Sequence, residues 1–241
     1  MIQQASSSNI NTSQQSLNSS VSPWLTRILY PLGCYVLLPL FFGKIKVTGQ
    51  ENIPQNGAVI VAPTHRSRWD ALIIPYAVGK LVSGRDLRFM VSANEVKGLQ
   101  GWIIRRMGGF PVDTEKPGID SVQHSIELMQ AEEMVVIFPE GGIFQDTKVH
   151  HLKRGVALIA LQADSAKVAN KVQILPVSIK YTSSYPSWGS KVNVDIGSPL
   201  KVEKYVTNSL RQSSQKLTKD LFTKLQELHE TKLELAQFQK D

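Results

Sequence analysis

Short apolar runs alternate with longer amphipathic segments through the middle of the chain. We predict a strand where about four to eight apolar residues run together and a helix where apolar residues recur every three or four positions. The predicted strands cover residues 57–63, 88–93, 134–139, 172–179 and 191–197. The predicted helices cover residues 69–83, 97–107, 118–131 and 154–164, and a Gly-Gly-Phe-Pro turn is expected at 108–111. This alternation indicates an α/β fold, with a mostly parallel or mixed central sheet flanked by helices.

Three segments outside this middle part have a different pattern. Residues 1–22 carry no charge and are rich in Ser, Asn and Gln, which is typical of a disordered polar tail. Residues 23–47 are the most apolar part of the chain. Leucines recur at helical spacing among polar residues in the last segment, which predicts a C-terminal amphipathic helix over 206–241. The folded domain is therefore expected to cover residues 48–205.

The apolar segment 23–47 favours a position in the membrane interface. Sixteen uncharged residues separate Arg27 from Lys44, and as a straight helix they would reach roughly 24 Å, less than the roughly 30 Å hydrocarbon core. Pro31 and Pro39 are expected to interrupt any helix. Aromatic side chains flanked by cations are typical of a monotopic anchor. We therefore predict an interfacial anchor at 23–47; a buried helix packed on the domain is the alternative.

The net charge of +7 lies in the first half of the folded part. Residues 23–110 contain 11 Lys and Arg against 4 Asp and Glu. Such a field attracts anionic surfaces, whether phospholipid headgroups or phosphorylated substrates. The sequence has no helix-turn-helix, zinc-finger or RNA-binding signature, so we predict no nucleic-acid partner. The single cysteine, Cys34, excludes an internal disulfide and a Cys-based zinc site.

Candidate chemistry begins with "THRSRWD" (64–70), which follows the predicted strand 57–63. His65 and Asp70 can meet if His65 ends the strand and Asp70 lies in the first turn of the next helix, where the helix dipole favours an acid. The carboxylate would then bind one imidazole nitrogen and leave the other free as a base. No G-x-S-x-G elbow or reactive-looking cysteine is present, so the activated hydroxyl would belong to the substrate. Taken alone, this spacing is weakly specific.

A second candidate motif is "FPEGG" (138–142), directly after the predicted strand 134–139. Glu140 can accept hydrogen bonds from substrate hydroxyls, and Gly141 and Gly142 let backbone amides approach an anion or a carbonyl oxygen. An ordinary strand-to-helix turn has a similar composition. Because ligands bind beyond the carboxyl ends of parallel strands, we expect His65 and Glu140 to converge with the loop 108–113.

Together the motifs form a series that resembles the phospholipid and glycerol acyltransferase family, which includes the 1-acylglycerol-3-phosphate acyltransferases. The resemblance covers roughly residues 45–200. Its remaining blocks are "VTGQENIP" (47–54), "GGFPVDT" (108–114), "HLKRGVALIA" (151–160) and "LPVS" (175–178). Each block is moderately specific, and their order and spacing carry the resemblance.

The resemblance implies an O-acyltransferase of phospholipid biosynthesis, with its catalytic domain at 48–205. His65, oriented by Asp70, would act as general base without an acyl-enzyme. An acyl-ACP or acyl-CoA thioester would donate a fatty acyl group to the free hydroxyl of a lysolipid, most often 1-acylglycerol-3-phosphate, giving phosphatidic acid. The resemblance implies no metal and no bound cofactor. The implied partners are the lipid bilayer, a lysophospholipid and the thioester donor, with the protein membrane-associated (monotopic or peripheral) on the cytoplasmic face.

The family pattern also implies which residues bind substrate, and the chain departs from it at three places. A lysine is common after the strand before "GGFPVDT", where "SANEV" (92–96) has alanine or asparagine. Thr114 stands where an arginine is common, and Thr64 stands before His65 where an asparagine is common. Arginine and lysine elsewhere could supply the phosphate clamp. The expected substrate-binding residues are Arg66, Arg68, Arg105, Arg106, Gly109, Asp113, Glu140, Gly141, Gly142 and Lys153.

Three alternatives stay open at this stage. The acceptor could be another lysolipid or a hydroxyl lipid without phosphate. The protein could instead bind membranes without catalysis. A metal-dependent hydrolase using His150 and His151 is disfavoured because the chain has no H-E-x-x-H or similar ligand spacing.

Overall fold

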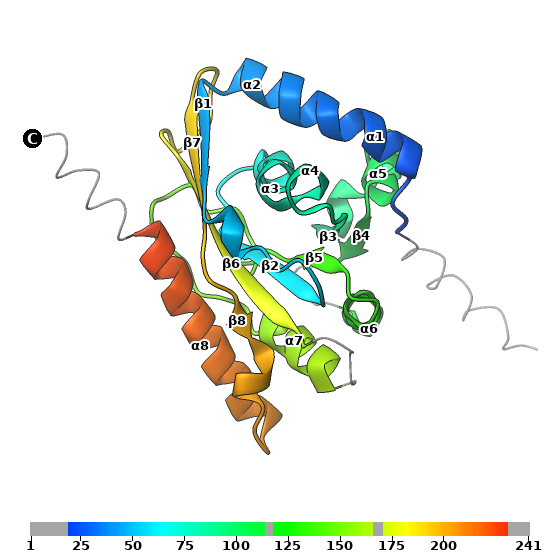
Figure 1. Cartoon of the computed structure of the whole chain (residues 1–241), viewed down its shortest axis with the longest axis vertical. Coiled ribbons are helices and arrows are strands. Elements are labelled where there is room, and N and C mark those ends of the chain that lie inside the picture. Colours follow the sequence, from blue (N-terminus) through cyan, green and yellow to red (C-terminus); the bar gives the residue numbers. More distant parts are fainter. Residues whose placement is uncertain (1–18, 114–117, 166–170, 231–241) are drawn as a thin grey trace, which may run out of the picture.

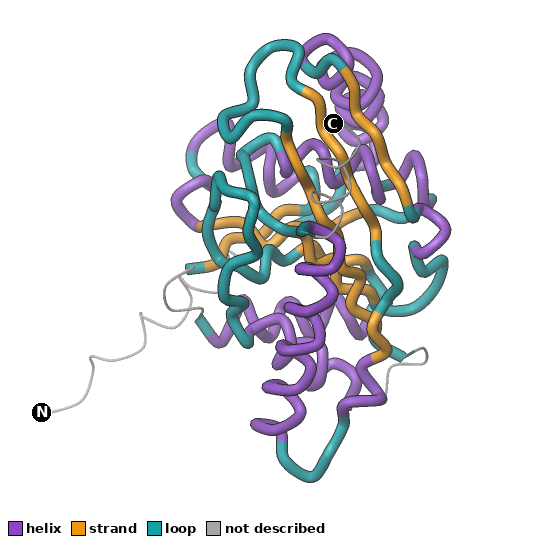
Figure 2. Tube along the Cα trace, turned by 90° about the vertical axis from the view of Figure 1, so that its left-hand side faces the viewer, coloured by secondary structure: helices purple, strands orange, loops and turns teal. Residues whose placement is uncertain are grey.

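The computed structural model describes residues 19–113, 118–165 and 171–230. Strands run through the middle of the molecule, and helices cover both faces of the sheet (Figures 1 and 2). The strands are β1 (Lys44–Thr48), β2 (Val59–Pro63), β3 (Leu87–Ser92), β4 (Gly109–Val112), β5 (Met134–Val136), β6 (Gln173–Tyr181), β7 (Lys191–Ile196) and β8 (Leu200–Lys201). The mixed α/β sheet expected from the sequence is confirmed.

The sheet has the order β1-β7-β6-β2-β5-β3-β4, and β8 pairs with β6. Every neighbouring pair is parallel except β6 with β7 and β6 with β8. The central strand β2 lies between β6 and β5, with Val61 opposite both Leu175 and Val136. Because β2 and β5 are parallel neighbours, the segments that follow them leave the sheet side by side. His65 follows β2 and Glu140 follows β5, so this topology brings the two motifs together.

Alternate residues of the sheet enter two separate cores, as side chains in a strand point to opposite faces. Ile60 and Ala62 of β2 pack in the core covered by the helices α6 (Ile119–Gln130), α7 (Gly155–Ser165) and α8 (Leu210–His229). Val59 and Val61 pack in the other core, under α3 (Asp70–Val78) and the end of the N-terminal helix. Because β2 is buried on both faces, its sequence is a continuous apolar run.

The remaining helices are α4 (Lys80–Ser83) and α5 (Gly98–Arg106), with short 3₁₀ turns at Gln50–Asn52, Ala93–Glu95 and Val202–Tyr205. The single helix predicted for 69–83 is divided at Gly79 into α3 and α4. A Cβ atom at Gly79 would lie 2.4 Å from the carbonyl oxygen of Pro75. Three strands were missed: β1, β4, which was predicted to be part of a turn, and the two-residue β8. Their shortness and, in β4, the glycine and proline hide the strand pattern.

The segment predicted as an anchor begins with one continuous helix, Pro23–Phe41, formed by α1 (Pro23–Pro31), a π-helical segment (Leu32–Leu37) and α2 (Leu38–Phe41). The expectation that prolines interrupt it was wrong, because the π-helical segment directly after Pro31 lets the chain continue. By length and composition alone this 19-residue helix could cross a membrane: its mean hydropathy is 1.4 over the apolar window, of which 28% is buried.

The structure moves the predicted N-terminal boundary of the domain. Residues 44–47 were assigned to the anchor, yet they form β1 and pair with β7. Residues 19–22, assigned to the polar tail, lie on the domain, where Val21 forms an antiparallel bridge with Met107. Residues 1–18 and the last part of the predicted C-terminal helix (231–241) lie outside the described residues.

The C-terminal helix α8 packs back on the domain as its leucine pattern predicts. It begins at Leu210, after an N-cap in which the Ser209 side chain accepts a hydrogen bond from the backbone N–H of Gln212. Its buried leucines lie in the same core as α7. The helix ends with His229, which is buried beside β6 and the loop that follows β2.

Candidate active site

The chain after β2 is held in place by Thr64. Its backbone N–H donates to the carbonyl of Val177 at 2.9 Å, and its side-chain oxygen accepts from the backbone N–H of Ile179, also at 2.9 Å. Thr64 therefore continues the hydrogen bonding between β2 and β6 past the end of β2, through its backbone N–H and its side-chain oxygen. The next residue is His65, and Asp70 opens α3. The two residues thus stand at a strand end and in a first helical turn, as the sequence predicts.

His65 and Asp70 are in direct contact. Nδ1 of His65 lies 2.9 Å from Oδ2 of Asp70, and the same oxygen accepts the backbone N–H groups of Arg66 (2.6 Å) and Ser67 (2.9 Å). Because the carboxylate is the acceptor of every one of these bonds, Nδ1 carries the proton in neutral His65. The other ring nitrogen, Nε2, is then unprotonated, which is the form that a general base needs.

Tyr181, at the end of β6, completes the surroundings of Asp70. Its hydroxyl donates to Oδ1 of Asp70 at 2.6 Å, and the carboxylate is fully buried. Burial and then the nearby carboxylate charge raise the pKa of the Tyr181 phenol well above its ordinary value, so the tyrosine stays a donor. Both carboxylate oxygens of Asp70 therefore accept hydrogen bonds, and these bonds fix the orientation of the carboxylate. Sequence reasoning missed Tyr181 because the two residues lie 111 positions apart.

The ring of His65 is fixed from the side as well. It stacks on Phe138 with 3.9 Å between ring centroids and 21° between planes. The carbonyl of His65 accepts the backbone N–H of Phe144 at 2.9 Å. The histidine side chain is 19% exposed while its aspartate is fully buried. The pair therefore combines a partly exposed imidazole with a buried carboxylate.

Glu140 supports the same loop from inside the protein. Its Oε1 accepts the backbone N–H of His65 at 3.1 Å, and its Oε2 accepts that of His150 at 3.0 Å. Arg66 donates through one guanidinium nitrogen to both carboxylate oxygens, at 3.0 and 3.1 Å. Both side chains are almost completely buried. Arg66 and Glu140, expected to bind substrate, are thus engaged with one another and with the backbone of the site.

Arg66 also reaches the C-terminal helix. Its Nε donates to Nε2 of His229 at 3.3 Å, and the far side of that ring, Nδ1, lies 2.9 Å from the Ser178 hydroxyl. Because arginine only donates, His229 must accept at Nε2 and is neutral. Burial, followed by the charges of Arg66 and Lys180, lowers the pKa of His229 to about 3. Sequence reasoning placed His229 in the helix without this contact.

The loop after β5 brings further predicted residues together. Gly141 has φ 71°, in the left-handed region, and a Cβ atom there would lie 2.5 Å from Cε of Lys153. The Lys153 side chain therefore lies against Gly141, and its backbone N–H donates to the Pro139 carbonyl at 2.8 Å. Gly142 follows and is partly exposed. Gly141, Gly142 and Lys153 thus share the loop that packs against His65.

Comparison with known proteins agrees with this geometry. The family model described as Acyltransferase matches residues 44–180, more than half of the chain. The chain belongs to the acyltransferase family.

Two relatives and one solved structure extend the comparison. The 1-acyl-sn-glycerol-3-phosphate acyltransferase of Bacillus subtilis (strain 168) is 28% identical over 197 residues, 80% of this chain and 91% of that protein. The protein of the same name from Streptococcus pneumoniae (strain ATCC BAA-255 / R6) is 28% identical over 152 residues, 60% of this chain but only 50% of that protein. The crystal structure of the 1-acyl-sn-glycerophosphate (LPA) acyltransferase PlsC from Thermotoga maritima matches with a TM-score of 0.63 and 24% identity, over 85% of this chain and 79% of that chain. This last likeness shows a common fold.

The other expected substrate-binding residues of this acyltransferase lie toward the β3–β4 edge of the sheet. Arg68 is exposed and pairs with Glu95 at 2.7 Å. Arg105 and Arg106 end α5, and the Arg106 guanidinium lies over the Trp102 ring at 5.2 Å. Gly109 is buried at the start of β4, and Asp113 follows the strand at the surface; Thr114 lies outside the described residues.

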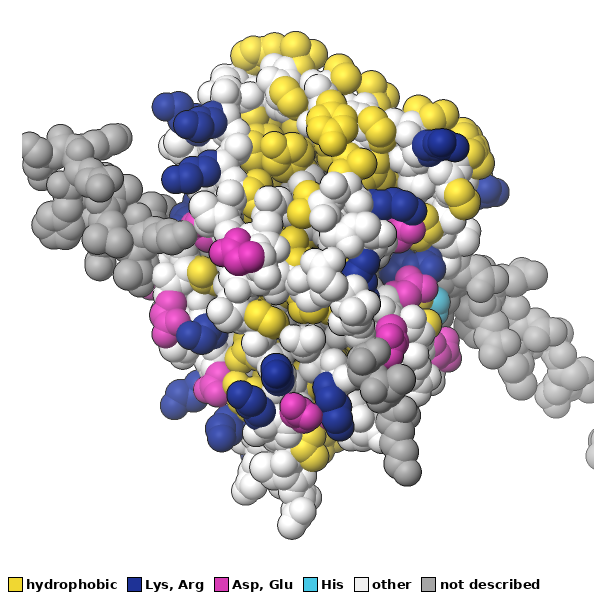
Figure 3. Space-filling view, viewed as in Figure 1, with side chains coloured by type: hydrophobic (Ala, Val, Ile, Leu, Met, Phe, Trp, Pro, Cys, Tyr) yellow, Lys and Arg dark blue, Asp and Glu magenta, His cyan; other side chains and the backbone are white. Residues whose placement is uncertain are grey.

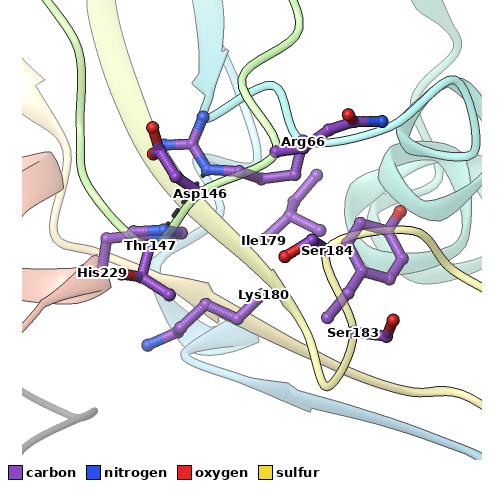
Figure 4. A pocket seen from close by; sticks show the side chains of 10 residues that line it. Arg66, Asp146, Thr147, Ile179, Lys180, Ser183, Ser184 and His229 are labelled. Carbon is purple, nitrogen blue, oxygen red and sulfur yellow. Dashed lines mark hydrogen bonds between the residues drawn. The ribbon is translucent and has the colours of Figure 1, made fainter.

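A small cavity lies behind the loop that carries His65, next to Arg66 and His229 (Figure 4). Its volume is about 50 Å³, enough for a few water molecules and too small for a lipid. His65 does not line it. Among the described residues no group of three or more His, Cys, Asp and Glu side chains could hold a metal ion, and His150 pairs with Asp146 at 2.7 Å.

Proposed function

We propose that this acyltransferase moves a fatty acyl group from an acyl-ACP or acyl-CoA thioester to the free hydroxyl of 1-acylglycerol-3-phosphate, giving phosphatidic acid. The observation that carries the mechanism is the 2.9 Å contact between His65 and a buried Asp70. Both relatives described above are named for this acceptor. No bound cofactor or metal takes part in the proposed reaction.

In the proposed reaction Nε2 of His65 removes the proton from the acceptor hydroxyl as its oxygen attacks the thioester carbonyl. A C–O bond forms, the C–S bond breaks, and the departing thiolate takes the proton back from His65. The imidazolium that forms between these steps is stabilised by the Asp70 carboxylate. The acyl group passes directly from sulfur to oxygen, so no acyl-enzyme is formed.

The loop after β5 is proposed to receive the polar part of the acceptor. The backbone N–H of Gly141 donates to the Phe138 carbonyl at 3.2 Å, so we propose that the amide of Gly142, which no Cβ atom shields, faces the acceptor. Lys153 lies against Gly141, and an ammonium group beside a backbone amide suits a phosphate. Arg66 and Glu140 would act indirectly, since their polar atoms hold the backbone of His65. Arg68, Arg105 and Arg106 are proposed as outer cations that attract the anionic headgroup, with Gly109 and Asp113 shaping that side of the site.

The N-terminal helix is proposed to place this site at a bilayer. Its outer face carries large exposed apolar side chains, and Figure 3 shows hydrophobic atoms along the top of the molecule over α1 and α2. The exposed members are Trp24, Ile28, Leu32, Tyr35, Val36, Leu37 and Leu40. An apolar face of this kind binds at the boundary of headgroups and acyl chains. A lysolipid acceptor resides in the same layer, on the proposed cytoplasmic face.

The decisive experiment measures transfer of a radiolabelled acyl group by the purified full-length protein. Both thioester types are offered with a panel of lysolipids, with and without phosphate. We expect phosphatidic acid from 1-acylglycerol-3-phosphate, and a loss of about 10⁴-fold in kcat for His65→Ala or Asp70→Asn. His151→Ala, which changes an exposed histidine, is the matched control and should keep wild-type activity.

Each other outcome identifies an alternative. Product only on an acceptor without glycerol phosphate would keep the mechanism and replace the substrate. Full activity in His65→Ala would refute the His65 mechanism. No product on any acceptor, with vesicle binding intact, would make the protein a non-catalytic membrane-binding member of the family.

A further inference from the structure

The connection between β6 and β7 (182–190) carries two large aromatic side chains that are exposed to solvent. Tyr185 is 71% exposed and Trp188 is 69% exposed. Neither residue belongs to the motifs of the catalytic loop, and neither is part of the N-terminal helix. Tyrosine and tryptophan combine an apolar ring with a polar tip, so they bind best where an apolar layer meets water.

This hairpin is attached to the end of the N-terminal helix. The Trp188 ring contacts the Phe41 ring edge to face, with 5.9 Å between centroids. The backbone N–H of Gly189 donates to the carbonyl of Phe41 at 2.8 Å. Phe41 in turn stacks on Trp69 at 4.3 Å, directly before Asp70. The exposed aromatics thus continue the apolar face of α1 and α2 and are joined to the catalytic loop.

Three exposed lysines flank the same corner of the molecule. Lys44 and Lys46 lie on one face of β1, and Lys191 of β7 is directly opposite Lys44 in the parallel register. Like charges at neighbouring positions across strands repel one another. Figure 3 shows Lys and Arg side chains gathered over the upper ends of β1 and β7, beside the hydrophobic atoms of the helix. An anionic surface at this corner would relieve that repulsion.

We propose that Tyr185, Trp188, Lys44, Lys46 and Lys191 form a second membrane-docking site, here named the hairpin site, which binds the headgroup layer of an anionic bilayer. The aromatic rings enter the interface and the lysines bind lipid phosphates. The hairpin site extends the membrane contact of α1 and α2 beyond the end of the helix to the β6–β7 connection, and a contact that includes both elements fixes the orientation of the protein on the membrane. The Phe41–Trp69 stack transmits that orientation to the His65–Asp70 pair.

The exposed Tyr185 and Trp188 favour a membrane over an acidic protein as the partner. Both would be attracted by three lysines, but exposed Trp and Tyr next to an apolar helix match the depth profile of a lipid interface. Lysines on an edge strand such as β1 also prevent edge-to-edge association of sheets, which is another explanation for Lys44 and Lys46. That explanation does not account for the exposed Tyr185 and Trp188. The inference rests on the proposed function for its choice of a membrane, since the acceptor is a lipid.

The test is co-sedimentation of the full-length protein with vesicles of phosphatidylcholine containing 0 to 40% phosphatidylglycerol, a range on the order of natural anionic membranes. The triple variant Lys44→Gln/Lys46→Gln/Lys191→Gln is expected to bind anionic vesicles roughly 100-fold more weakly, at about fivefold per lysine. On neutral vesicles it should bind as the wild type does. The difference should shrink as salt screens the charges.

A charge-matched control removes three exposed lysines at the opposite end of the molecule, Lys201→Gln/Lys204→Gln/Lys219→Gln, which lie on β8, the following 3₁₀ turn and α8. It should bind like the wild type. Tyr185→Ser/Trp188→Ser should weaken binding about tenfold or more on neutral and anionic vesicles alike. Equal losses in the two lysine triples would overturn the hairpin site, because net charge alone would then explain them.

Two further outcomes keep this proposal separate from the proposed function. Wild-type transfer activity on detergent-dispersed substrates is measured in parallel: its absence refutes the proposed function, while the vesicle results alone decide the hairpin site. Unchanged vesicle binding in the first lysine triple, with reduced use of acyl-ACP and normal use of acyl-CoA, would assign the lysines to an acidic protein and overturn the membrane proposal.

Discussion

Two arginines lie two positions apart between His65 and Asp70, and their surroundings are opposite. The side chain of Arg66 is 4% exposed and donates to Glu140, His229 and two backbone carbonyls. That of Arg68 is 80% exposed and pairs only at the surface, with Glu95. From the sequence both are equally good candidates to hold a phosphate. In the structure Arg66 binds the loop between His65 and Asp70 from inside the protein, and Arg68 lies at its surface.

The difference shows how the loop after β2 is stabilised. A buried guanidinium must satisfy its donors within the protein. Arg66 therefore joins two distant segments: the loop after β5, which it contacts at Glu140 and Lys148, and the end of α8 at His229. Arg68 has water as a partner and contributes little to this framework. The same residue type is therefore buried in a hydrogen-bonded framework in one position and exposed to solvent in the other.

The largest effect is expected from removing the buried arginine. Arg66→Met should lower the free energy of unfolding by about 3–5 kcal/mol, because it leaves the Glu140 carboxylate buried without its partner. Arg68→Met, the matched control, should cost about 1 kcal/mol or less. Urea unfolding followed by circular dichroism measures both. Equal effects of the two substitutions would contradict the contrast drawn between them.

A double variant sharpens the same comparison. In Arg66→Met/Glu140→Gln neither charge remains, so the loss of stability should be smaller than the sum of the two single losses. The glutamine oxygen can still accept the backbone N–H of His65. Additive losses would mean that Arg66 and Glu140 do not act as a pair.

Tyr181→Phe tests whether the precise aim of Asp70 matters for catalysis. A hydrogen bond to a buried charged group contributes about 1.5–3 kcal/mol, so kcat should fall about 10- to 100-fold as Asp70 loses its fixed orientation. The KM values for donor and acceptor should stay the same, since Tyr181 does not touch them in the proposed mechanism. Steady-state kinetics separates the two constants. An unchanged kcat would show that the backbone bonds alone position Asp70.

His229 makes the buried network sensitive to acid. Its folded-state pKa is lowered to about 3, while the unfolded chain binds a proton near pH 6.5. The unfolded state therefore gains protons first as the pH falls. The free energy of unfolding should decrease by about 1.4 kcal/mol for each pH unit below 6.5, or ~2 kcal/mol at pH 5. His229→Gln should show a flatter pH dependence, whereas the exposed control His151→Gln should follow the wild type.

The smallest effect concerns the outer arginine itself. If Arg68 attracts the acceptor headgroup, Arg68→Ala should raise the KM for 1-acylglycerol-3-phosphate only a few-fold and leave kcat unchanged, because an exposed charge acts through water and salt. The increase should vanish with an uncharged acceptor. A loss in kcat would place Arg68 in contact with the reacting atoms and undo the contrast with Arg66.

Much of the fold was accessible to sequence reasoning because its signals are local. The apolar runs of β2, β5 and β6 and the periodicity of α6 and α7 are each visible within about ten residues. Elements whose pattern was short or mixed were missed, as β1 and β4 were. The continuous helix through Pro31 was missed for another reason: the π-helical segment that accommodates the proline has no sequence signature of its own.

The sequence by itself determined the α/β alternation, the apolar character of the N-terminal segment, and the positions of His65 and Asp70 at the end of a strand and the start of a helix. These follow from spacing within one segment. Only the tertiary structure decided that Tyr181 donates to Asp70, that Arg66 is buried against Glu140 and His229, and that Trp188 lies against Phe41. Those contacts join segments between 74 and 163 positions apart, and local periodicity carries no information about which distant segments the sheet brings side by side.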